Sequence, residues 1–192
     1  MGNYEGTKDA TFTIEGYKVG DTGPTGGWIF YKLVSGKDNY AGQYEDCLYL
    51  ETAPEDYHNG DTYTYYWGDD GTFRTGTAIG TGKANTATIV NYTSSSRNPN
   101  AATASNDYSV TVGEKVYDDW FLPSKDELNE MYENLCKNGI GNFTTNNPYY
   151  WSSSENESLS NDAWLQGFTY GTQYDYISRN NNIYRVRPIR AF

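Results

Sequence analysis

The sequence predicts an α+β fold, in which short strands come first, helices follow and a run of strands ends the chain. Three observations support this prediction. An apolar, β-rich run occupies residues 28–34, and a helical pattern with a complete N-terminal cap begins at Ser124. After residue 138 the chain changes to Tyr, Asn, Ser and Thr in short stretches, a composition that favours strands and turns. We therefore expect mixed or antiparallel sheets with two or three helices.

The first half of the chain predicts an arm, two strands and two helices. Residues 1–16 are polar and are expected to form an N-terminal arm, so the folded domain is expected to span residues 17–192. The expected elements are strands at 28–34 and 47–50, a loop at 54–78 anchored by Trp67, and helices at 82–92 and 98–107.

The clearest helix begins after Ser124. Ser124 and Glu127 have the spacing of a capping box, in which each side chain accepts a hydrogen bond from the other residue's backbone N–H. Gly139 or Gly141 is expected to end the helix. The apolar face has the spacing i, i+3, i+4, i+7 and consists of Leu128, Met131, Tyr132 and Leu135.

The C-terminal segment fits three or four strands with a hairpin turn at Gly171. In the second strand, Trp164, Gln166 and Phe168 alternate with smaller or more mixed residues, so the large side chains are expected on one face. Arg185 and Arg187 are expected to pair with acids or carbonyls. The strands are expected near 149–153, 163–169, 173–178 and 184–190, and the inward side chains are Trp151, Trp164, Phe168 and Val186.

The charge of the chain is uneven. The net charge is -11, and the surplus of acid lies in residues 1–150, because residues 151–192 hold four Arg and four acids. An acidic surface repels phosphate backbones, so no nucleic-acid partner is expected. The sequence has no apolar run long enough for a membrane span and no visible signal peptide, so any lipid anchor would lie outside this sequence. We expect a monomer.

The motifs that could carry chemistry are weak. Residues 80–84 lack the spacing of a phosphate-binding loop, and residues 67–71 lack the calcium-loop pattern, so both are expected to be turns. With one histidine, His58, a zinc site is not expected. Cys47 and Cys136 are compatible with one disulfide or with two free thiols. We expect no cofactor, no metal and no catalytic residue, and therefore no enzyme.

The tyrosines of the tail are interleaved with small polar residues, as in antibody binding loops. Tyrosine gives a large contact area at a low cost in conformational entropy. An ordinary β-sheet also favours Tyr and Thr, so composition alone leaves a binding surface and simple sheet packing both open.

A set of specific motifs favours the binding surface. Taken together, these motifs resemble those of the variable proteins of diversity-generating retroelements over about residues 17–192. The set comprises residues 19–24, 79–86 and 119–124, then Trp151-Ser152-Ser153-Ser154-Glu155, Ala163-Trp164, Gln166, Phe168, Gly171 and Gln173, and finally Arg185-Val186-Arg187-Pro188-Ile189-Arg190-Ala191-Phe192.

This resemblance implies a C-type lectin fold of the formylglycine-generating-enzyme subclass, with variable residues displayed in the C-terminal region at about 151–184. It also implies a protein at the cell surface or outside the cell that binds protein or cell-surface ligands. In that family, reverse transcription randomises template adenines, so that Asn codons ending in a pyrimidine become codons for Tyr, Asp, Ser, Thr, Leu, Ile, Gly or Asn.

Applied to this tail, the rule selects the positions between the fixed motifs whose side chains can arise in this way. Glu157 and Arg179 do not fit it. The predicted ligand-binding positions are Ser158, Leu159, Ser160, Asn161, Asp162, Leu165, Gly167, Thr169, Tyr170, Thr172, Tyr174, Asp175, Tyr176, Ile177, Asn180, Asn181, Asn182, Ile183 and Tyr184.

The chain departs from its wider relatives at two points. The calcium tripeptides of sugar-binding C-type lectins do not occur, and the catalytic cysteine pair of formylglycine-generating enzymes has no counterpart in the tail. Neither calcium-dependent sugar binding nor enzyme activity therefore carries over. The alternative function is a fixed, adhesin-like or structural C-type lectin-like domain of a larger surface protein.

Overall fold

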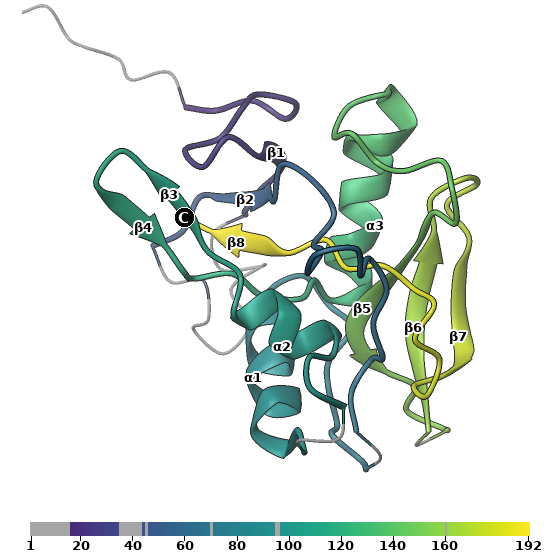
Figure 1. The fold of residues 1–192 in the computed structure, drawn as a ribbon. Coiled ribbons are helices and arrows are strands. Elements are labelled where there is room, and N and C mark those ends of the chain that lie inside the picture. The colour runs from purple at the N-terminus through teal and green to yellow at the C-terminus, as the bar shows by residue number, and fades with distance from the viewer. Residues whose placement is uncertain (1–15, 35–43, 45, 70, 95–96, 160) are drawn as a thin grey trace, which may run out of the picture.

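The computed structural model describes residues 16–34, 44, 46–69, 71–94, 97–159 and 161–192, and its fold is α+β, as predicted. The described residues form two three-stranded sheets, a two-stranded hairpin and three α-helices (Figure 1). Nearly all of the predicted N-terminal arm, residues 1–15, lies outside the described residues, as does Ser160. Within the described part, no helix has both the length and the apolar character needed to cross a membrane.

The first sheet joins the two ends of the described chain. It consists of β1 (Trp28–Lys32), β2 (Tyr49–Thr52) and β8 (Ile189–Ala191), all antiparallel with β2 in the centre. The strand predicted at 47–50 begins two residues later, because Cys47 N–H donates to the Tyr44 carbonyl in a turn. The strand predicted at 184–190 is largely wrong, since Tyr184 and Arg185 form only isolated bridges before β8 begins.

The second sheet is an antiparallel meander. It consists of β5 (Tyr149–Glu155), β6 (Asp162–Gly167) and β7 (Gln173–Ser178), with β6 in the centre. Gly171 adopts φ +74 in the turn between β6 and β7, a region that favours glycine. A Cβ at this position would also lie 2.2 Å from the Tyr132 ring, so the predicted hairpin turn at Gly171 is confirmed with a second reason for glycine.

The helices agree closely with prediction. Helix α1 spans Gly82–Tyr92, α2 spans Ala101–Asn106, and α3 spans Lys125–Asn134, followed by a 3-10 turn, η3 (Cys136–Asn138), that ends at the left-handed Gly139. Asn100 caps α2, so this helix is shorter than the predicted 98–107. The capping box of α3 is present, with Ser124 as N-cap.

Glu127 explains how α3 is fixed to its surroundings. Its carboxylate is fully buried and accepts from Ser124 N–H at 2.7 Å, Gly80 N–H at 2.9 Å and the Tyr44 hydroxyl at 2.5 Å. Burial raises the pKa of Glu127, while these hydrogen bonds oppose the rise. This acid is therefore structural.

One element was absent from the prediction. Strands β3 (Val110–Val112) and β4 (Lys115–Tyr117) form a small hairpin that turns at Gly113, with φ +62. Its side chains are mostly exposed, so apolar and polar residues do not alternate in the way that marks a half-buried strand.

Helix α3 lies between the two three-stranded sheets (Figure 1) and contacts β1, β5 and β6. One core cluster joins α1 and α2 to the second sheet through Trp67, Trp151 and Leu165. Trp67 anchors the loop at 54–78, as predicted. A second cluster joins α3 to the first sheet through Phe30, Leu128 and related side chains. The second sheet therefore contributes side chains to both core clusters.

Candidate binding surface

The exposed residues of the tail gather at the two ends of the second sheet. Because Asp162 lies opposite Ser178 and Gln166 opposite Gln173, the turn at 168–172 marks one end of the β6–β7 pair. Residues 156–159 and 161, before β6, and residues 179–184, after β7, lie at the other end. The most exposed apolar side chains of these segments and of β7 are Leu159, Tyr170 (86 %), Tyr176 (63 %) and Ile183.

A chain of tyrosine rings joins the exposed Tyr176 to the core. The Tyr149 ring lies 6.2 Å from that of Tyr174 and 6.1 Å from that of Tyr184, and Tyr176 lies 6.2 Å from Tyr174. Tyr184 meets the buried Trp151 edge-on at 4.9 Å. Burial raises the pKa of Tyr184. The rings offer an amphipathic surface that rests on the buried Trp151.

Tyr149 belongs to this surface although it is not among the predicted positions. It lies two residues before Trp151 on the same strand, and alternate residues of a strand share a face. That spacing predicts packing of Tyr149 against the core, and only the ring contacts place it beside Tyr174 and Tyr184.

An irregularity in β7 sets the direction of Tyr176. Leu165 lies opposite Tyr174 and Ala163 opposite Ile177, so β7 has one extra residue between these pairs. Such a bulge redirects side chains and strengthens the local twist. The Asn156 side chain donates to the Asp175 carbonyl at 2.6 Å, which holds the bulged backbone in place.

Segment 179–184 is held by a buried residue at its start. The Arg179 guanidinium is fully buried, pairs with Glu155, donates to the Gly71 carbonyl at 2.7 Å and lies 4.5 Å from the Trp67 ring. The exclusion of Arg179 from the predicted binding positions thus agrees with its burial. Between Arg179 and Tyr184, which forms a bridge with Tyr65, the exposed residues are Asn180, Asn182 and Ile183.

The loop before β6 has a similar support. The Asn156 side chain accepts hydrogen bonds from Ser158 N–H at 2.8 Å and Leu159 N–H at 3.1 Å. Asn156 itself is buried, whereas Ser158, Leu159 and Asn161 are exposed. A fixed amide therefore shapes the backbone of a loop whose side chains face solvent.

Two predicted binding positions are buried. Leu165 is 2 % exposed and belongs to the core beside Trp151, and Gly167 is also buried. A Cβ at Gly167 would lie 2.9 Å from the Tyr149 ring, so larger side chains would not fit without a shift. Neither residue lies on the exposed surface. Of the other described positions, Asp162, Tyr174, Asp175, Ile177, Asn181 and Tyr184 are half-buried, and the rest are exposed.

Trp164, Gln166 and Phe168 all contact α3, as their predicted alternation requires, but the inward packing predicted for Trp164 is only partial. This side chain is half-buried, with the Lys125 ammonium 5.1 Å from its ring, while its neighbour Leu165 faces the core. Gln166 is buried on the side of α3, where its amide donates to Asn129 at 2.9 Å. Both faces of β6 are covered, and a strand covered on both faces loses a simple inside–outside alternation. Trp151, Phe168 and Val186 are buried as predicted.

The ends of the surface are fixed by arginines. Arg187 donates to Asp56 at 2.9 Å, and Arg185 lies 3.5 Å from the same carboxylate and donates to the Asn147 carbonyl at 3.3 Å. The predicted pairing of Arg185 and Arg187 is confirmed. The Tyr150 hydroxyl also donates to Asp56, and burial raises its pKa above the usual value.

Of the reactive side chains, Cys136 lies beside the turn at 168–172, with its thiol 3.5 Å from the Phe168 carbonyl. Cys47 and Cys136 are both free thiols, and burial raises the pKa of each. His58 lies 3.8 Å from Glu55 in a partly exposed turn. Among the described residues, His, Cys, Asp and Glu form no group suited to a metal ion. The surface itself offers phenol rings, amides, hydroxyls and short apolar chains, which suit binding.

The chain matches no model of a known protein family, and no curated protein is significantly similar to it in sequence.

Proposed function

We propose that the protein is a ligand-binding display module, a variable protein of a diversity-generating retroelement with a C-type lectin fold. Its ligands would be proteins or cell-surface molecules, it would act at the cell surface or outside the cell, and it would perform no catalysis. The observation that carries the proposal is the division of the tail between a buried, charge-paired framework and an exposed set of residues.

This division supports the codon rule of the family in two ways. Residues that template adenines could not readily produce, such as Trp151, Glu155 and Gln166, are buried and hydrogen-bonded or packed. Most residues that adenine randomisation could produce are exposed or half-buried. Since stability rests on the first group, the second group could change with little effect on folding.

The alternative is a fixed, adhesin-like or structural domain of a larger surface protein. Tyrosine and threonine would then serve sheet packing alone. The exposure of Tyr170 and Tyr176 favours the display function, because large side chains that serve packing are not left mostly in solvent.

The deciding experiment is to sequence the encoding gene with its downstream flank in many clones of the source population. We expect a near-copy of codons 151–192 downstream, and differences between clones only where that copy carries adenine. Codons 17–150 of the same clones are the internal control and should not vary in this way. If no copy exists and the clones are identical over 151–192, the retroelement proposal is wrong and the fixed-domain alternative takes its place.

A further inference from the structure

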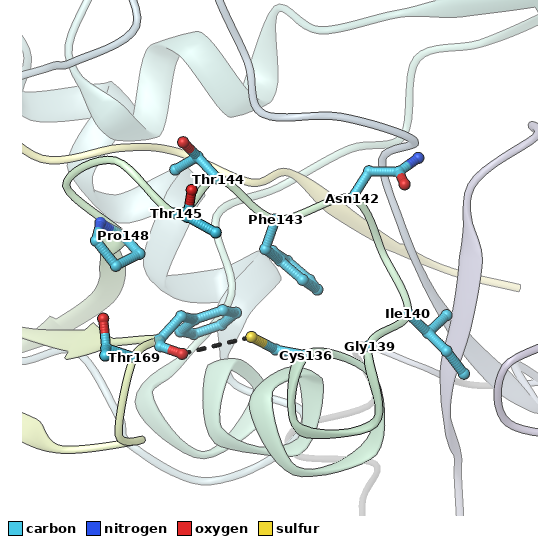
Figure 2. A pocket seen from close by; sticks show the side chains of 10 residues that line it. Cys136, Gly139, Ile140, Asn142, Phe143, Thr144, Thr145, Pro148 and Thr169 are labelled. Carbon is cyan, nitrogen blue, oxygen red and sulfur yellow. Dashed lines mark hydrogen bonds between the residues drawn. The ribbon is translucent and has the colours of Figure 1, made fainter.

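A hollow of about 370 Å³ lies beside one end of the display surface. It is formed by η3, the loop 139–148 and the start of the β6–β7 turn. Figure 2 shows Pro148 and Thr169 on one side, Ile140 and Asn142 on the other, and Phe143 between them. Cys136 lies at the base, with its thiol 3.5 Å from the Phe168 carbonyl. Volumes of 300–1,000 Å³ are typical of pockets that hold ligands.

The lining of this hollow is uncharged. Its walls consist of aromatic, aliphatic, hydroxyl, amide and thiol side chains, although the chain as a whole has a net charge of -11. A charged group placed here would lose its hydration without gaining an ion pair, so an uncharged occupant is favoured. The apolar walls from Phe143, Phe168, Ile140 and Pro148 suit a ring, and the threonine side chains of the lining suit a polar tip.

The aromatic wall is held in place from behind. The Phe143 ring meets the Phe168 ring edge-on at 4.9 Å, and the Arg187 guanidinium lies 4.5 Å from the Phe143 ring. Arg187 is itself buried and paired with Asp56 at 2.9 Å. A wall fixed in this way loses little freedom when an occupant enters.

The loop that bounds the hollow has an unusual backbone. Asn142 and Asn147 both have φ near +52, two of the four left-handed non-glycine residues in the described chain. Such conformations persist where the surroundings impose them, and they gather at ligand-binding sites. The hollow is also continuous with the display surface, because Thr169 lines it and is followed by the exposed Tyr170.

We propose that this hollow, the anchor pocket, receives a phenylalanine or tyrosine side chain projecting from a protein ligand on the adjoining display surface. The inference rests on the proposed function and adds to it a contact whose lining, apart from Thr169, lies outside the predicted variable positions. Aromatic side chains buried in pockets near interface centres supply much of the binding energy of protein complexes. Diversified residues would then select the ligand, while the anchor pocket would hold a feature that many ligands share.

The two cysteines provide a matched internal test. Both are free, both are half-buried, and burial raises the pKa of both thiols, but only Cys136 lines the anchor pocket. The full chain is treated with iodoacetamide, and alkylation of each thiol is followed by peptide mass spectrometry. N-acetyl-tyrosinamide is the probe, N-acetyl-aspartate amide is the charged control, and free p-cresol represents a ring without a peptide backbone.

We expect millimolar N-acetyl-tyrosinamide to slow alkylation of Cys136 by about threefold or more, as occupancy of most sites would require, with no change at Cys47. The charged control should protect neither thiol. Protection by p-cresol alone would overturn the proposal in favour of a site for free small molecules. Equal slowing of both thiols, or of neither, would also overturn it.

Saturation-transfer NMR gives an independent readout. Ring signals of N-acetyl-tyrosinamide should show transfer from the natural chain and should lose it in Thr145→Trp, which fills the mouth of the pocket. Thr111→Trp on the exposed β3–β4 hairpin is the matched control and should keep the signal. Transfer that survives Thr145→Trp, or is absent throughout, contradicts the proposal. Neither method uses the protein ligand or the gene sequence, so failure here would leave the retroelement proposal standing.

Discussion

Three arginines near the C-terminus are almost completely shielded from solvent, and each forms an ion pair with a carboxylate from another segment. Arg179 pairs with Glu155, Arg187 with Asp56, and Arg190 with both Asp119, at 2.8 Å, and Glu51, at 3.3 Å. Burial of a charge is tolerated only where pairing and hydrogen bonds compensate for lost hydration. These pairs therefore fix where the tail runs, since each alternative path would leave a charge buried alone.

Substitution of Arg179 by methionine should be strongly destabilising, because it leaves the buried Glu155 without its cation. We expect Arg179→Met to lower the free energy of unfolding by about 3–5 kcal/mol, measured by urea denaturation. Lys137→Met removes the exposed partner of Glu133 and should leave the denaturation midpoint unchanged. Similar losses in the two variants would show that burial does not decide the strength of these pairs.

At the scale of single elements, the sequence predicted the helices better than the strands. Local sequence signals identify a helix, such as the N-cap at Ser124 and the apolar spacing of Leu128 and Met131. The burial of a strand residue depends on what covers each face of the strand. The first core cluster covers one face of β6 and α3 covers the other, so Leu165 is buried although it was predicted as a binding position, and Trp164 is half-buried. The strand predicted at 184–190 was largely wrong for a related reason. Isolated bridges and side-chain contacts, rather than a continuous ladder, hold residues 184–188.

The cap of α3 offers a test of this local control. Ser124 accepts from Glu127 N–H and donates to the Ala78 carbonyl at 2.9 Å while fully buried. Ser124→Ala should therefore lower the free energy of unfolding by about 1–2 kcal/mol, near the upper range for loss of an N-cap. Ser158→Ala, at an exposed position, is the matched control and should give the midpoint of the natural chain. An unchanged midpoint in Ser124→Ala would mean that packing alone holds the helix.

At the scale of the whole molecule, the framework and the display surface are made by interleaved residues of one segment. The sequence could predict most of this surface, because the residue types that tolerate exchange differ from those that build the core. It could not place Leu165 and Gly167, whose side chains fit the codon rule but whose neighbours Trp151 and Tyr149 leave them no access to solvent. Residue type limits what can vary, and packing decides what is exposed.

A combined variant should test the separation of framework and surface. We expect Tyr170→Ser, Tyr176→Ser and Ile183→Asn together to shift the melting temperature by no more than about 2–4 °C, because exposed substitutions each change stability little. The single substitution Trp151→Ala should lower the free energy of unfolding by about 3–5 kcal/mol. If the triple variant melted as early as Trp151→Ala, measured by circular dichroism, the surface would be part of the framework.

The position of β8 at the end of the chain has a consequence for products with a shifted reading frame. This strand follows residues 151–184 and pairs with β2, and Arg187 and Arg190 contact carboxylates more than a hundred residues earlier in the chain. A product whose reading frame slips anywhere within residues 151–184 therefore lacks both the strand and the two cations, leaving Asp56 and Glu51 without them. Such a product could not close its first sheet. If residues 151–184 are diversified as proposed, only copies read in frame through this segment would form the β2–β8 pairing and both arginine contacts.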